Sequence, residues 1–94
     1  MLSFLPPTPS EVMGNIKTNF RKQRKDLGYT QEKLATRSGV SLGTLKRFER
    51  TGQISLESLL KLAFVLECLD GFNELCNVKV VVPNSLEDLL VDNQ

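Results

Sequence analysis

The chain has 94 residues, of which 40% are hydrophobic and 24% are charged, a composition typical of one soluble globular domain. It contains no histidine, which disfavours most acid–base enzymes, and no apolar run reaches the roughly 18 residues that a membrane span requires. The net charge of +1 hides a basic first half, with ten Lys and Arg against four Asp and Glu in residues 1–52, and an acidic second half, with two against seven. This asymmetry suggests a polyanion partner for residues 1–52, although surface charge scattered by chance would give the same counts.

Residues 1–9 contain three prolines and are expected to form an extended arm ahead of the main domain, which we place at residues 10–77. Ser10 is the expected N-cap of the first helix, and Gly28 is expected to end it. Between them, apolar residues recur at helical spacing, at Val12, Ile16, Phe20 and Leu27. This helix should pack its apolar side on the core and expose its basic residues, which are Lys17, Arg21, Lys22 and Lys25.

Two short helices are predicted next, over residues 31–37 and 42–50, with a tight bend at Gly39 between them. Thr30 and Ser41 are the expected N-caps, and Gly52 is expected to end the second helix. On a helical wheel, the inward side of residues 42–50 holds Leu42, Leu45, Phe48 and Glu49. The outward side holds Gly43, Lys46, Arg47 and Arg50. A short helix with a basic outer side, presented across a tight bend, fits the major groove of DNA.

Ser55 is expected to cap a fourth helix that is apolar on nearly all sides, because residues 59–66 are all apolar except Lys61. A helix of this kind buries more than one face. One domain of this size covers one face, so we expect a second subunit to cover the other. Cys68 and Cys76 lack zinc-type spacing and are expected to be buried, unreactive thiols rather than a redox or metal site.

The last segment, residues 78–94, is expected to contact a second subunit or another partner. Pro83 ends a predicted short β-strand, which consists of residues 78–82 and includes Val78, Val80, Val81 and Val82. Pairing with the same strand of a second subunit would satisfy its backbone groups; the alternative is an ordered coil on the core. A short amphipathic turn follows, with one side formed by Leu86, Leu89 and Leu90. Three interpretations of this tail remain open: packing on the protein's own core, fraying, or docking into a partner's groove.

A resemblance to a known family is carried by the stretch QEKLATRSGVSLGTLKRFER, residues 31–50. It resembles the helix-turn-helix of phage-repressor-type (XRE-like) regulators, and the resemblance extends through GQISLESLLKLAFVLECLDGFNEL. The fold that it implies is all-α, a five-helix phage-repressor-like DNA-binding domain, to which the C-terminal strand would be added. Ser38 departs mildly from the family pattern, where this position is usually apolar.

A narrower resemblance, to HipB-like regulators, is carried by GVSLGTLKRFERTGQISLESLLKLAFVL together with the later NSLEDLL. HipB-like proteins are DNA-binding antitoxins encoded beside HipA-like kinase toxins. The resemblance implies a homodimer that represses its own operon and binds a HipA-like kinase toxin or an accessory subunit.

The family resemblance also implies roles for individual residues. Gln31 would bond a DNA phosphate, and the positions that touch bases or the adjacent phosphates are Ser41, Leu42, Gly43 and Thr44. Because neither Leu42 nor Gly43 can donate a side-chain hydrogen bond, base reading should depend on thymine-methyl contact and on the outward basic residues Lys46, Arg47 and Arg50. Arg47 is the preferred candidate for a guanine contact. Leu42 could instead only join the two helices.

Two other positions have a structural role in the family. There, an Arg and a Glu at the positions of Arg24 and Glu49 form a partly buried ion pair that ties the reading helix to the scaffold. The alternative is that Arg24 and Glu49 are two independent surface residues. Breaking one partner of such a pair costs about 3–5 kcal/mol, because an uncompensated charge stays behind.

From these patterns we expect a cytoplasmic, sequence-specific transcriptional repressor of a double-stranded DNA operator, acting as a homodimer and as the autoregulating antitoxin of a HipBA-like operon. The alternatives are a stand-alone or phage-derived XRE-type regulator, or a protein-interaction adaptor that has kept the fold. No carboxylate pair, phosphate-binding glycine loop or nucleophile motif predicts an enzyme, and no pattern predicts a cofactor or a metal ion.

Overall fold

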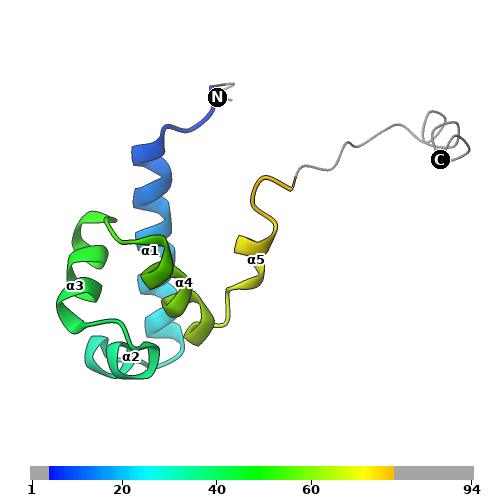
Figure 1. Cartoon of the computed structure of the whole chain (residues 1–94). Helices are drawn as coiled ribbons and strands as arrows, with labels where there is room; N and C mark the ends of the chain where they lie inside the picture. Colours follow the sequence, from blue (N-terminus) through cyan, green and yellow to red (C-terminus); the bar gives the residue numbers. More distant parts are fainter. Residues whose placement is uncertain (1–4, 78–94) are drawn as a thin grey trace, which may run out of the picture.

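The computed structural model describes residues 5–77, in which five helices are arranged around one core (Figure 1). Their bounds are α1 Pro9–Asp26, α2 Gln31–Ser38, α3 Leu42–Thr51, α4 Leu56–Val65 and α5 Asp70–Asn73. Residues 5–77 contain no β-strand, so the described part of the chain is all-α as predicted. The predicted strand at 78–82 and the leucine-containing tail lie outside the described residues.

The first helix begins earlier than predicted, because Thr8 rather than Ser10 is its N-cap. The Thr8 hydroxyl accepts from the Glu11 backbone N–H at 3.1 Å, and the Glu11 carboxylate accepts from the Thr8 N–H at 2.8 Å. This reciprocal capping box satisfies two N–H groups at once, whereas Ser10 would satisfy one. Pro9 is therefore the first residue of α1, a position at which the backbone N–H has no partner within the helix. The prediction of an extended arm over residues 1–9 was wrong for Pro9.

The starts of α2, α3 and α4 and the ends of α2 and α3 follow the predicted caps. The side chains of Thr30, Ser41 and Ser55 each accept a hydrogen bond from the backbone N–H three residues later, at 3.0, 3.1 and 3.1 Å. Gly39 and Gly52 end α2 and α3 with φ values of 77° and 81°, in the left-handed region that glycine adopts at least cost. Both helices run one residue further than predicted.

The core lies where α1, α2, α3 and α4 meet. It consists of Phe20, Leu34, Ala35, Val40, Leu45, Phe48, Leu62, Ala63 and Leu66, all buried. The Phe20 ring stands edge-on to two other rings, with centroids 5.6 Å from Phe48 and 6.1 Å from Phe72. Phe20 thus joins α1 to α3 and to the short α5, which lie on opposite sides of α1 in Figure 1.

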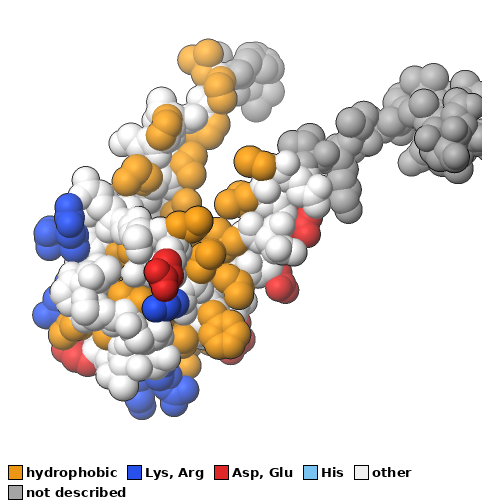
Figure 2. All heavy atoms as spheres, in the orientation of Figure 1, with side chains coloured by type: hydrophobic (Ala, Val, Ile, Leu, Met, Phe, Trp, Pro, Cys, Tyr) orange, Lys and Arg blue, Asp and Glu red, His pale blue; other side chains and the backbone are white. Residues whose placement is uncertain are grey.

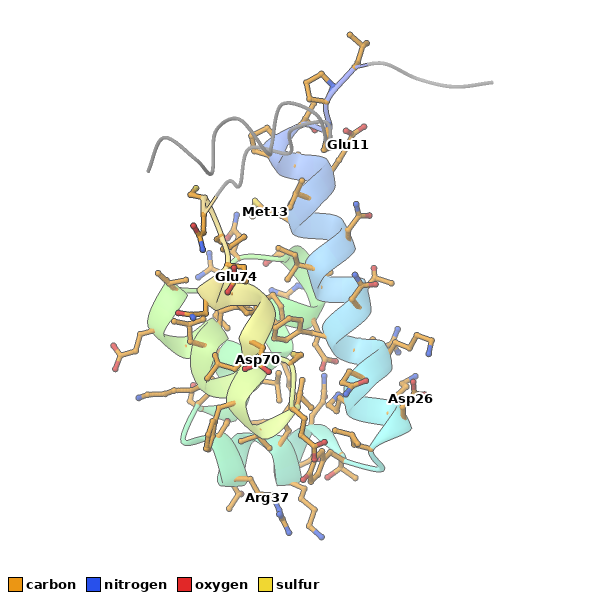
Figure 3. All side chains as sticks on the ribbon, turned by 90° about the vertical axis from the view of Figure 1, so that its right-hand side faces the viewer. Glu11, Met13, Asp26, Arg37, Asp70 and Glu74 are labelled. Carbon is orange, nitrogen blue, oxygen red and sulfur yellow. The ribbon has the colours of Figure 1, made fainter. Side chains whose placement is uncertain are left out.

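Helix α4 is buried on one face only. Leu62 and Ala63 are completely buried, but Leu56 and Phe64 are 65% and 72% exposed. The single chain therefore leaves part of this apolar helix uncovered, and the second subunit expected to cover it stays a prediction. Figure 3 shows the neighbouring α5 from the front, with Asp70 as its first residue and Glu74 as the residue that follows its end.

The two cysteines differ in their surroundings. Cys68 is partly buried, and burial raises the pKa of its thiol. Cys76 is exposed, so the expectation that both thiols are buried was wrong for Cys76. Cys76 follows α5, beyond the last core residue, Leu66. Within residues 5–77, no helix is both long and apolar enough to cross a membrane.

Candidate nucleic-acid interface

The bend between α2 and α3 is held by backbone and hydroxyl contacts. The Gly39 N–H donates to the Ala35 carbonyl at 3.0 Å, and Val40 is buried behind the bend. The Ser38 hydroxyl donates to the same carbonyl at 3.3 Å and accepts from the Val40 N–H at 3.1 Å. Ser38, which departs from the family pattern, thus supplies a hydrogen bond to a backbone group of the bend.

An ion pair attaches α3 to α1. Arg24 donates from Nε and Nη2 to the two carboxylate oxygens of Glu49, at 2.7 and 3.0 Å. The side chains are only 9% and 5% exposed. The remaining Arg24 nitrogen, Nη1, donates to the Tyr29 carbonyl at 2.8 Å, which extends the contact to the segment before α2. The structure therefore brings together the two residues that the resemblance pairs, and it does so with bidentate geometry.

Gln31 belongs to the same network. It is the first residue of α2, and its amide Nε2 donates to Glu49 Oε1 at 2.9 Å. This contact ties α2 to α3 and orients the Gln31 amide, so a substitution of Gln31 would disturb the scaffold as well as any phosphate contact. Its role as a phosphate ligand stays a prediction.

The residues at the start of α3 lie in different surroundings. Ser41 is exposed, caps the helix, and donates from Oγ to Thr44 Oγ1 at 2.8 Å. Leu42 is partly buried against the core, which favours the role of joining the two helices. Gly43 is exposed, and a Cβ at this position would meet nothing within 4 Å. Packing within the domain therefore does not require a glycine at position 43.

The outward side of α3 is basic. Lys46, Arg47 and Arg50 are all exposed and lie on this helix. Figure 2 shows Lys and Arg side chains on the α3 side of the molecule and at the end formed by α2, whereas hydrophobic side chains gather over α4 and α5. Because the Arg24–Glu49 pair holds the opposite side of α3, the basic side faces solvent in a defined orientation.

Three contacts were not predicted from the sequence, two of them near the end of α3 and one at α2. Lys17, assigned to the solvent side of the first helix, is half-buried and donates from Nζ to the Arg50 carbonyl at 2.9 Å. Arg47 Nη2 donates to Gln53 Oε1 at 2.6 Å. Arg37 lies over the Tyr29 ring, with its guanidinium carbon 5.4 Å from the centroid. A lysine beside a helix C-terminus is a known capping pattern, but no local signal links residues 17 and 50.

Comparison with known proteins identifies this arrangement. A family model described as helix-turn-helix matches residues 20–68, just over half of the chain, from the middle of α1 to the residues that follow α4. Neither a curated protein nor a solved structure matches the chain. The matched region contains the bend, the basic helix α3 and both residues of the buried ion pair. The chain therefore belongs to the helix-turn-helix family of the phage-repressor (XRE) type, and residues 20–68 are the DNA-binding domain of such a regulator.

Proposed function

We propose that this protein is a sequence-specific transcriptional repressor that binds operator DNA as a homodimer and has no catalytic role. The observation that carries the proposal is the basic, exposed side of α3, held outward by the buried Arg24–Glu49 pair on its other side. In this arrangement α3 enters the major groove, and its first residues and Arg47 meet base edges. Gln31 and Arg50 contact phosphates and position the helix.

The apolar surface of α4 supports the homodimer. Between the end of α2 and α4 lies a groove of about 370 Å³, whose apolar lining residues are Leu60, Phe64, Val65 and Leu69. Phe64 is 72% exposed there, which is unusual for the largest apolar side chain of a helix. In a two-fold dimer the second subunit covers this face, and the two copies of α3 reach half-sites about one helical turn apart.

The resemblance to HipB-like regulators supports a more specific role, that of the autoregulating antitoxin of a HipBA-like operon. The partner would be a HipA-like kinase toxin or an accessory subunit, and the acidic second half of the chain, including the segment after Pro83, would contact it. Removal of the residues after Pro83 tests this proposal in the full complex. Lost toxin binding with an unchanged melting temperature supports it, whereas a lower melting temperature without the toxin assigns the tail to the protein's own core.

A salt titration tests the DNA-binding role. The full chain is mixed with a labelled duplex from the region upstream of its own coding sequence, and the dissociation constant is measured at several salt concentrations. Affinity should fall steeply as salt rises, because each phosphate contact releases counterions. An excess of unrelated duplex should compete poorly. Failure to bind any duplex at low salt would favour an adaptor that has kept the fold.

A further inference from the structure

The turn after α3 forms a hydrogen bond with Arg47, one of the basic residues on the outward side of α3. Gln53 lies two residues beyond the end of α3, and its Oε1 accepts a hydrogen bond from Arg47 Nη2 at 2.6 Å. Thr51 connects the same residues through the backbone, because its hydroxyl donates to the Arg47 carbonyl at 2.8 Å and accepts from the Gln53 N–H at 3.1 Å. Three hydrogen bonds thus link Arg47 to the turn.

The position of this turn is set by α1. Gly52 has a φ of 81°, and a Cβ placed on it would lie 3.2 Å from the Met13 carbonyl oxygen, so the backbones of α1 and the turn are in close contact. Gln53 also lines a hollow of about 350 Å³ with Met13, Ile16 and Ile54. One helical turn further along α1, Lys17 donates from Nζ to the Arg50 carbonyl at 2.9 Å. The Gln53 backbone is therefore placed by contacts that involve the scaffold rather than α3 alone.

The hydrogen bond from Arg47 to Gln53 reduces the conformational freedom of the Arg47 side chain. A free Arg side chain samples many rotamers and loses that freedom when it contacts a base, which weakens binding. The Gln53 amide oxygen occupies one N–H of the Arg47 guanidinium and leaves the other donors of its planar fork available. Arg47 is thus partly ordered before DNA is bound, and the direction of its fork is restricted.

We propose that Gln53 is a positioning residue for DNA recognition, which orients Arg47 and thereby restricts the base that Arg47 reads. The reading surface then includes the turn after α3 as well as the helix. This inference rests on the proposed function, because it requires Arg47 to contact a base. Gln53 itself acts through Arg47 and makes no base contact.

A double-mutant cycle on the full chain tests the inference. The probe is the duplex that the wild-type protein enriches from a random-sequence pool. The variants are Gln53→Met, which keeps the length of the side chain and removes the amide acceptor, Arg47→Ala, and both together. Gln53→Met should lower the affinity about threefold to tenfold, the effect of one hydrogen bond. In the Arg47→Ala background it should have no further effect, because the group that it positions is gone.

Base preference provides a second readout. Gln53→Met should relax the preference at the same base position as Arg47→Ala, while the thermal midpoint stays unchanged because both side chains are exposed. Gln53→Glu retains an acceptor and should keep the wild-type preference, although its negative charge lowers the affinity for every duplex. Additive losses in the cycle would show that Gln53 contacts DNA directly and would overturn the inference. If Arg47→Ala alone changed neither affinity nor base preference, the proposed base-reading role of Arg47 would be wrong. That failure can be told apart from failure of the Gln53 inference, because it is seen in the single Arg47 variant.

Discussion

Helices α3 and α4 are both short helices of one small domain, but different kinds of contact surround them. Polar contacts with defined geometry hold α3: the ion pair from Arg24, the amide of Gln31 and the Lys17 ammonium on the Arg50 carbonyl. Apolar packing provides most of the contacts on the buried side of α4, where one hydrogen bond, from Gln23 Nε2 to the Leu66 carbonyl at 2.9 Å, is added at the helix end, and the other side exposes Phe64. Hydrogen bonds restrict the orientation of a helix, whereas the energy of apolar contacts depends mainly on how much apolar surface is removed from water. The comparison therefore indicates that polar contacts fix the direction of α3, whereas α4 leaves an apolar side uncovered within one chain.

The largest expected effect comes from breaking the polar attachment of α3. Glu49→Ala leaves the Arg24 guanidinium buried without its carboxylate partner and should lower the free energy of unfolding by about 3–5 kcal/mol. Chemical denaturation measures this loss. The matched control is Glu57→Ala, which removes a carboxylate from an exposed pair 3.4 Å from Lys61 and should change stability little. Equal losses in the two variants would show that the buried pair does not hold α3 in place.

The second prediction concerns the uncovered face of α4. Wild-type protein at micromolar concentration should have about twice the chain mass of 10.5 kDa by light scattering. Phe64→Glu should shift the mass to that of the monomer and leave the fold intact, because Phe64 is 72% exposed within one chain. The control is Leu27→Ser. Leu27 is an exposed apolar residue that does not line the α4 groove, so this change should leave the dimer intact. A wild-type protein that stays monomeric at high concentration contradicts the proposed assembly.

The third prediction concerns the basic side of α3. Arg47→Ala should weaken binding to the preferred duplex by about 1–3 kcal/mol and relax the choice of base at one position. Arg37→Ala, a change of an exposed arginine on α2, is the control and should not alter base preference. Quantitative gel-shift titrations against single-base variants of the duplex measure both effects. Wild-type selectivity in Arg47→Ala would exclude Arg47 as a base-reading residue.

The smallest effect is expected at Gly43. A methyl group at position 43 meets no neighbour within 4 Å, so Gly43→Ala should stabilise the helix by about 0.5 kcal/mol. If DNA approaches this position closely, the same change should lower DNA affinity. Gly14→Ala, in α1, also meets no neighbour and serves as the control, since it should stabilise the protein without a change in DNA binding. Unchanged DNA affinity in Gly43→Ala would place the DNA contact elsewhere on α3.

Much of the fold could be predicted because helix termini are encoded locally. Ser41, Gly39 and Gly52 mark the limits of α2 and α3 through cap and turn chemistry that involves only neighbouring residues. The start of α1 was missed because Ser10 competes with a capping box at Thr8, and the box satisfies more backbone groups.

The contacts around α3 were harder to predict. Lys17 and Arg50 are 33 positions apart, and helical periodicity says which side a residue faces but not which carbonyl a long side chain reaches. Gln53 follows a helix end and belongs to no periodic pattern, so its contact with Arg47 is visible only in three dimensions. The Arg24–Glu49 pair was anticipated through the family resemblance, since spacing alone does not pair two residues in different helices.

The most direct test of the difference between α3 and α4 is a backbone amide NMR titration of the full chain with its preferred duplex. The largest shift changes should occur at the start of α2, across Leu42–Thr51 and in the turn at Gln53. The amides of Leu56–Val65 should change little, because in the proposed dimer α4 would face the second subunit in both the free and the DNA-bound state. Changes concentrated on α4 and α5, with α3 unaffected, would contradict the assignment of α3 as the DNA-reading helix.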